Sequence, residues 1–309
     1  MMSKSYISDI AKLVGQLSRF IYYVHHVDGR SGYISFRDSS GFLGCEEYKS
    51  RIAEVARKRL NFKNWDESWI GTGKIADCAK RAMGVSGNNL VDDHQKTDFG
   101  NRLDRKHSKY HPEAERVLYD IYRNPLCDEA TAFSNAVKTF GAKYDTIAFL
   151  FFIKDDTRFL PVSPGHFDKG FAIIGIDYVT SYRCGWENYQ GFIDIIKDIR
   201  DVMEDMLPMK GTPRLIDAHS FVWVIQEDRF IEWTPDAEQS IQIEQTAEEY
   251  IQGVVSGTGG RRRVTSSVFN RSADVVKKTR MRAKAHASIA TKQRLLRTKR
   301  VIPIWKFIM

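Results

Sequence analysis

Hydrophobic residues recur every three or four positions through the first part of the chain, which is the spacing of one face of an α-helix. In the stretch 5–24, for example, Leu13 and Leu17 belong to such a face. Pro112 precedes one predicted helix, and Gly84 follows another as a stop signal. Five helices are predicted, over residues 5–24, 46–60, 73–83, 113–123 and 128–140. We therefore expect a helical domain over residues 1–142.

The pattern changes near residue 144. Thr146–Ile153 is a continuous apolar run, and Arg158–Val162 follows it after a short turn, so together they predict a buried β-hairpin. Ser163 and Pro164 form a helix start signal. Further helices are predicted from Pro164, over Trp186–Leu207, over Asp217–Ile225 and, as a polar surface spacer, over Ala237–Gln252. The predicted fold class is α+β and mainly helical, with a small α/β domain over residues 143–252.

Composition places the chain among ordinary globular proteins, since 309 residues with 42% hydrophobic content suffice for two cores that need no cofactor to fold. The four cysteines are far apart without a C-x-x-C pair, which predicts free thiols rather than a disulfide framework or a zinc site. Charged residues interrupt the N-terminal apolar positions, and no apolar run is long enough to span a bilayer. We expect a cytoplasmic protein that does not use a membrane.

Charge is distributed unevenly along the chain. Residues 251–309 contain fifteen Lys and Arg and one acid, whereas residues 1–250 contain 32 bases and 38 acids. The segment 253–309, joined by the glycines near residue 258, is thus a strongly basic tail on a mildly acidic body. This asymmetry is typical of proteins that bind polyanions, above all nucleic acid. The predicted DNA-binding residues of the tail are Arg261, Arg262, Arg263, Arg271, Lys277, Lys278, Arg280 and Arg282.

The sequence of the tail also resembles part of a known protein family. Behind the glycine joint, residues 270–285 predict a helix with an R-x-x-x-V-x-x-x-x-x-x-R-A pattern, which resembles the lead-in to the HNH nuclease domain of restriction-type endonucleases. The phrases FLPVSPGHFDKGF, CGWENYQGF and LIDAHSFVWVI resemble the domain that precedes this module in such enzymes. The resemblance implies that residues 143–252 recognise DNA and that a homodimer is one candidate assembly.

The family's metal-binding sequences are missing from the chain as written. The family continues with C-E-x-C and then Y-L-E-V-H-H, whereas residues 286–309 contain no cysteine and no histidine pair. If the codons from His286 onward are read from their third base, they permit C-E-Y-C and, at the family's spacing, L-E-V-H-H; the Glu at Trp305-Lys306 is forced. We expect a frameshifted or truncated HNH module, since Phe307 and Ile308 cannot bind a metal ion.

An intact family member would use histidines to hold a divalent metal that activates water, and cysteine pairs to hold a structural zinc. For the present chain, in consequence, we predict no catalytic residue, no metal ligand and no cofactor.

Within the body, residues 96–111 combine bases with polar and aromatic residues, a mixture that suits contacts with phosphates and bases. The predicted DNA contacts here are Arg102, Arg105, Lys106 and Lys109. The alternative is a solvated loop before the helix that Pro112 begins. His107 and His111 have the spacing of a metal pair on a helix, but no carboxylate completes a known motif.

A second candidate region of the body is aromatic. Tyr178, Tyr182, Arg183, Trp186, Asn188 and Tyr189 lie within twelve positions. Rings that stack and polar groups that donate hydrogen bonds predict a pocket for a base or a modified base. The alternative is that Trp186 and Tyr189 anchor the core. Asp217 and His219 have the look of a catalytic dyad, but Asp217 also suits a helix start and no nucleophile accompanies the pair.

The hypothesis that joins these observations is a restriction-type HNH endonuclease, modification-dependent in one version, that acts in defence against phage or other foreign DNA and is catalytically inactive as written. One alternative is a non-catalytic nucleic-acid-binding protein whose basic tail holds phosphates by counterion release. Another is a peripheral membrane protein whose tail binds anionic lipid.

Overall fold

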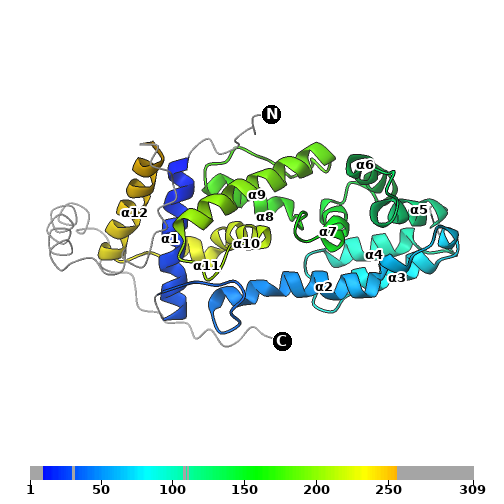
Figure 1. Ribbon diagram of the computed structural model, residues 1–309, viewed down its shortest axis with the longest axis horizontal. Coiled ribbons are helices and arrows are strands. Elements are labelled where there is room, and N and C mark those ends of the chain that lie inside the picture. Colours follow the sequence, from blue (N-terminus) through cyan, green and yellow to red (C-terminus); the bar gives the residue numbers. More distant parts are fainter. Residues whose placement is uncertain (1–9, 30–31, 107–108, 110, 256–309) are drawn as a thin grey trace.

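The computed structural model describes residues 10–29, 32–106, 109 and 111–255, which form an elongated helical body (Figure 1). The helices of this part are α1 (Ile10–Asp28), η1 (Phe42–Glu47), α2 (Tyr48–Leu60), η2 (Phe62–Asn64), η3 (Glu67–Trp69), α3 (Lys74–Met83), α4 (Asp93–Arg102), α5 (His111–Tyr122), α6 (Glu129–Phe140), α7 (Tyr144–Lys154), α8 (Pro164–Ile173), α9 (Trp186–Met206), α10 (Leu215–Ile225), α11 (Asp228–Glu232) and α12 (Ala237–Val255), where η marks a short 3-10 helix. The mainly helical class is therefore confirmed.

Local sequence signals explain several helix ends. Asp128 caps α6 by accepting a hydrogen bond from the Thr131 amide at 2.9 Å, and Pro164 occupies the first turn of α8. Gly84 follows the last residue of α3, as predicted. Asp217 takes part in a capping box with Arg214 at the start of α10, where its carboxylate accepts from the Arg214 amide at 2.8 Å. The predicted start of α8 and end of α3 are therefore confirmed, whereas α10 begins at Leu215, two residues before the predicted Asp217.

The predicted hairpin over residues 146–162 is wrong, and with it the small α/β domain. Residues 144–154 form α7, and residues 155–163 are an irregular connection. Within the described ranges the only β-type pairing is one isolated bridge between Ile34 and Met209. The apolar run is continuous because α7 is covered on every side, by α2, α4, α5 and α6. A fully buried helix and a fully buried strand have the same apolar pattern over eight residues, so periodicity could not separate them.

Two further regions differ from the sequence prediction. Lys96–Arg102 belongs to α4, a helix capped by the Asp92 carboxylate, which accepts from the His94 amide at 2.8 Å. The predicted surface spacer is helical, as α12, but it packs along α1. The Tyr22 hydroxyl donates to Gln242 at 2.7 Å, and Thr246 is buried. Although α12 is polar in composition, one of its faces packs against α1.

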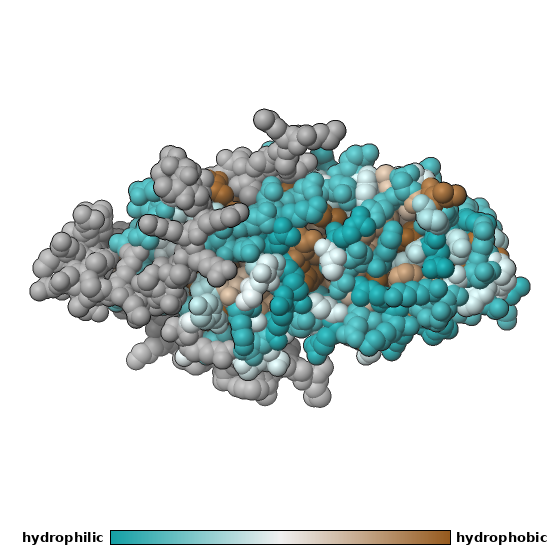
Figure 2. All heavy atoms as spheres, in the orientation of Figure 1, coloured by the Kyte–Doolittle hydropathy of each residue, from teal (hydrophilic) through white to brown (hydrophobic). Residues whose placement is uncertain are grey.

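Buried residues from both sides of position 142 form one hydrophobic core. In Figure 1, α1 and α12 lie side by side at one end, α3 to α6 gather at the other, and α2, α7, α8, α9 and α10 occupy the middle. Hydrophilic residues cover most of the face seen in Figure 2. None of the helices in the described part is long and apolar enough to cross a membrane. All four cysteines are free, as predicted.

Candidate functional site

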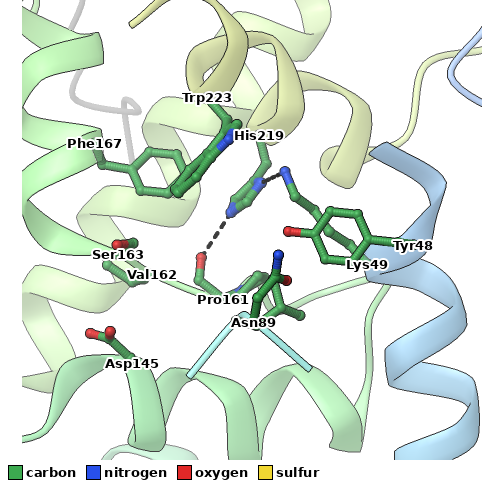
Figure 3. Close-up of a pocket in the computed structure, with 11 residues that line it drawn as sticks. Tyr48, Lys49, Asn89, Asp145, Pro161, Val162, Ser163, Phe167, His219 and Trp223 are labelled. Atoms are coloured by element: carbon green, nitrogen blue, oxygen red, sulfur yellow. Dashed lines mark hydrogen bonds between the residues drawn. The ribbon is translucent and has the colours of Figure 1, made fainter. Parts of the chain in front are cut away.

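A small cavity opens in the middle of the body, where α2, α7, α8 and α10 meet (Figure 3). Its volume is about 40 Å³. A single water molecule needs roughly 10–15 Å³, so the cavity admits a group of a few heavy atoms. It is lined by Tyr48, Lys49, Asn89, Leu90, Asp145, Pro161, Val162, Ser163, Phe167, His219 and Trp223. Both charged and aromatic side chains therefore face one small space.

Lys49, on the first turn of α2, forms one wall. Its side chain is only 1% exposed, and its ammonium donates to Glu46 Oε2 at 2.6 Å and to Ser220 Oγ at 3.0 Å. Burial lowers the pKa of Lys49, because a charge loses solvation in the interior, and the neighbouring Glu46 carboxylate acts against this by raising it. The ammonium also lies 5.5 Å from the centre of the Trp223 ring. Glu46 is thus the buried charge partner of Lys49.

The neighbour of this pair, His219 on α10, is held in one tautomer. Its Nε2 lies 3.0 Å from the carbonyl oxygen of Pro161, which can only accept a hydrogen bond, so Nε2 carries the proton. Nδ1 is then free to accept from the Lys49 ammonium at 3.4 Å. Burial lowers the pKa of His219 well below its ordinary value, and the Lys49 charge lowers it further. His219 is therefore a neutral, fixed part of the wall.

The closeness of Ser220 to Lys49 invites comparison with a Ser–Lys catalytic pair. Such a pair needs a neutral lysine that takes the serine proton. Here the Lys49 ammonium is paired with the Glu46 carboxylate at 2.6 Å, and Ser220 is 1% exposed and does not line the cavity. The arrangement supports binding rather than covalent chemistry.

The opposite side of the cavity carries the polar side chains of Asp145 and Ser163 and the ring of Phe167. Asp145 lies in the first turn of α7. Burial raises the pKa of its carboxyl, and hydrogen bonds from its own backbone amide and from the Gln95 side chain act against this. Ser163 precedes α8, but its hydroxyl does not cap that helix. The ring of Phe167 lies 4.6 Å from that of His219, centre to centre, and adds an apolar surface. Figure 3 shows these groups around one opening, with Tyr48 and Asn89 on the other side.

Two of the predicted DNA contacts of residues 96–111, Arg102 and Arg105, donate to backbone carbonyls. Arg102 donates to the Thr139 carbonyl at 2.7 Å and to Asp98 at 3.3 Å. Arg105 donates to the Thr72 carbonyl at 2.8 Å, which holds it near the start of α3. Lys106 and Lys109 are exposed. Three of the four basic residues therefore lie on the surface, while Arg102 is half-buried against α6.

The aromatic residues predicted to form a base pocket do not surround one cavity. Tyr189 is fully buried, and its hydroxyl accepts from the Leu160 amide at 3.1 Å and donates to the Leu160 carbonyl at 2.7 Å. The Tyr178 hydroxyl donates to the Asn188 carbonyl at 2.7 Å, and Asn188 itself accepts from Tyr144 at 2.8 Å. Hydrogen bonds of these side chains connect the turn before α9 to α7.

The remaining members of that set divide between core and surface. Trp186 is half-buried, 5.8 Å from the Phe133 ring between centres. Tyr182 is fully exposed and has a positive φ of 60°, and Arg183 beside it is exposed too. Only Tyr182 and Arg183 are therefore presented to solvent in the way a stacking contact requires.

The histidine pair yields no metal site in the described part of the chain, where no group of three or more His, Cys, Asp or Glu could hold an ion. His107 lies outside the described residues. His111 Nε2 is buried 3.8 Å from Glu115, whose carboxylate accepts from the Ala76 amide at 2.8 Å and so caps α3. The predicted tail residues 261–282 and the stretch 286–309, for which we predict a frameshift, also lie outside the described residues.

Sequence reasoning missed the cavity residues Lys49, Asp145, Ser163 and Trp223. Each one, taken alone, looks like an ordinary surface or core position. They come from segments far apart in the sequence, as the contact between Lys49 and His219, 170 positions apart, shows. The only local signal was Glu46 three positions before Lys49 in an amphipathic segment. Comparison of the chain with protein families, with characterised proteins and with solved structures finds no match.

Proposed function

We propose that this chain is the DNA-binding part of a restriction-type HNH endonuclease and that it does not cleave DNA as its sequence stands. The observation that carries the proposal is the charge distribution, with fifteen bases and one acid in residues 251–309 against a mildly acidic body. Counterion release from phosphates makes such a segment a strong and salt-sensitive DNA ligand. The role is recognition of foreign DNA, with modified bases as one class of target.

The body contributes a smaller set of contacts. Arg105, Lys106 and Lys109 are exposed in one loop, and Tyr182 with Arg183 is exposed in another. A basic loop positions a protein on the phosphate backbone, and an exposed tyrosine can stack on a base. In this proposal the tail supplies most of the affinity and the body supplies the discrimination between sequences.

A non-catalytic nucleic-acid-binding protein is the second candidate, and a specific observation favours it. Residues 286–309 contain a single histidine and no cysteine, so the ligands that an HNH module needs are absent from the sequence. In this second candidate function the basic tail binds DNA without cleaving it. Cleavage by a frame-shifted protein would distinguish the endonuclease from the non-catalytic protein.

The salt dependence of DNA affinity tests the proposal. Fluorescence anisotropy with a 20-bp duplex would be measured between 50 and 200 mM salt for the full chain. The tail variant replaces Arg261, Arg262, Arg263 and Arg271 by Gln. The control variant makes the same charge change on exposed residues of the body, with Lys63, Arg123, Lys138 and Lys169 replaced by Gln.

Each lost phosphate contact reduces the slope of log K against log salt by about 0.9. The tail variant should therefore lose roughly three to four units of slope by the same rule, and the control should lose far less. Equal losses would place the DNA site on the body. A full chain without salt-sensitive binding would refute the proposal itself.

A further inference from the structure

We infer that the cavity between α2, α7, α8 and α10 is a recognition pocket for the amino-bearing edge of a cytosine-type base, extruded from DNA or presented by a single strand. The inference rests on the proposed DNA-binding function and adds the class of ligand to it. It is carried by three features of the cavity: its size, the chemistry of Asp145 and Ser163, and the absence of a free charge on the Lys49 wall.

Size limits what can enter. About 40 Å³ accommodates a few heavy atoms, which is the edge of a pyrimidine and not a whole nucleotide. The rest of the ring would remain at the mouth, where Tyr48 and Trp223 are half-buried and each offers part of a ring (Figure 3). Flipped bases are read in this manner, by hydrogen bonds to the Watson–Crick edge and contacts with aromatic side chains.

The polar groups select the edge. The Asp145 carboxylate accepts from the Gln95 side chain and its own amide, and two oxygens with about four lone-pair sites leave it able to accept a further hydrogen bond. This suits the exocyclic amino group of cytosine, since Asp and Glu accept from this group in known readout geometry. The Ser163 hydroxyl can donate to the ring nitrogen of the same base. The Asn89 side chain is hydrogen-bonded to the Tyr48 hydroxyl, and its amide has two N–H donors, so one can serve the carbonyl oxygen of the base. Thymine would set its carbonyl oxygen against the carboxylate, which is repulsive. The set therefore favours cytosine and its 5-substituted forms.

The wall formed by Lys49 makes the ligand a neutral one. Its ammonium has Glu46, Ser220 and His219 as partners, so its three protons are all used within the protein. The adjacent Glu46 carboxylate compensates its charge at 2.6 Å. A phosphate would thus find no available cation here. Lys49 and His219 act as positioning residues that fix the wall and do not contact the base.

Duplexes with one readily extruded base test the inference in the full chain. The probes are 20-bp duplexes with a central cytosine, 5-methylcytosine or thymine, each opposite an abasic site, which lowers the cost of extrusion. The variants are Asp145→Ala and Ser163→Ala. The control is Asp77→Ala, because Asp77 is an exposed acid in the first turn of α3, just as Asp145 lies in the first turn of α7.

The wild-type chain and Asp77→Ala should prefer both cytosine duplexes over thymine by roughly tenfold, the discrimination expected of one good base contact. Asp145→Ala should bind all three duplexes alike while keeping the salt slope of the wild type. Ser163→Ala should reduce the preference. Salt-sensitive binding without any preference in the wild type would overturn the pocket and leave the DNA-binding proposal intact.

A second measurement is independent of the tail. Deoxycytidine and thymidine at millimolar concentration would be titrated into the full chain while the NMR signals of the tryptophan indoles are recorded. Deoxycytidine should shift one indole signal, identified as that of Trp223 by its loss in Trp223→Phe, and the shift should vanish in Asp145→Ala. No shift with either nucleoside, together with no preference among the duplexes, would overturn the inference even if the protein binds DNA by another surface.

Discussion

The Nζ atom of Lys49 lies 2.6 Å from Glu46 Oε2, and both side chains are almost completely buried, 1% and 7% exposed. The pair joins the start of α2 to α10 through Ser220 and His219. A buried pair is costly to desolvate, so its main effect is that neither partner can be removed alone. Removing one partner alone should therefore destabilise the folded protein.

Lys49→Met should lower the free energy of unfolding by about 3–5 kcal/mol, because it leaves the Glu46 carboxylate buried without a partner. The double variant Lys49→Met with Glu46→Gln should recover most of that loss. Lys58→Met is the matched control on the same helix, since it breaks an exposed pair with Glu54 and should change little. Urea denaturation measures all three, and a double variant no more stable than Lys49→Met would contradict the account.

The neutral state of His219 gives a prediction for pH. Its pKa in the folded protein lies well below the ordinary value, so between about pH 6.5 and the lowered pKa the unfolded chain binds a proton that the folded chain does not. Stability should therefore be fully present above about pH 6.5 and fall as the pH drops through this window, by up to about 1.4 kcal/mol per pH unit.

His219→Gln removes the titrating group and should flatten the loss between pH 6.5 and 5, where the carboxylates contribute least. His94→Gln, an exposed histidine on α4, serves as the control and should keep the wild-type slope. The free energy of unfolding from urea titrations at four pH values would show the difference. Identical slopes in wild type and His219→Gln would mean that His219 is not the group that binds the extra proton.

Tyr189 provides a third test, one that distinguishes a core role from a ligand role. Tyr189→Phe leaves both the amide and the carbonyl of Leu160 without their side-chain partner, and unsatisfied buried groups cost about 1–3 kcal/mol each. We expect a loss of roughly 2–4 kcal/mol in the free energy of unfolding and unchanged DNA affinity. Tyr182→Phe, at a fully exposed position, should leave stability within about 0.5 kcal/mol.

Local signals predicted the helices well, because caps and stop residues act over a few positions. Asp128 and Pro164 are examples, since α6 begins directly after Asp128 and α8 begins at Pro164. The strand prediction for residues 146–153 failed because a helix that is buried on all sides is apolar at every position, as a buried strand is. The helical and strand periodicities cannot then be distinguished. Tertiary contact alone decides that such a segment is helical.

The cavity could not be predicted from the sequence for a different reason. Lys49 and His219 are 170 positions apart, and their contact depends on how α2 and α10 pack. The rings of Tyr178–Tyr189 attracted attention because they are close in sequence, yet Tyr189 turns inward to Leu160. Density of suggestive residues along the chain is a poor guide to which side chains share a cavity.

The last prediction concerns the reading frame. The chain as written should cut no DNA with Mg²⁺, Mn²⁺ or Zn²⁺, because residues 286–309 lack the histidine pair and the cysteines of an HNH module. Shifting the frame at His286 permits C-E-Y-C and L-E-V-H-H, so the frame-shifted protein should bind zinc and nick DNA in the presence of a divalent ion.

Replacing either restored histidine should abolish this cleavage without changing the unfolding of the body, because we expect the glycine-rich sequence near residue 258 to isolate the tail from the body. Zinc content by mass spectrometry and nicking of supercoiled plasmid are the two measurements. The substrates should include methylated, hydroxymethylated and phosphorothioate DNA, since the target modification is open. A frame-shifted protein that folds and takes up zinc yet leaves every substrate intact would replace the endonuclease proposal with the non-catalytic one, in which the basic tail only binds.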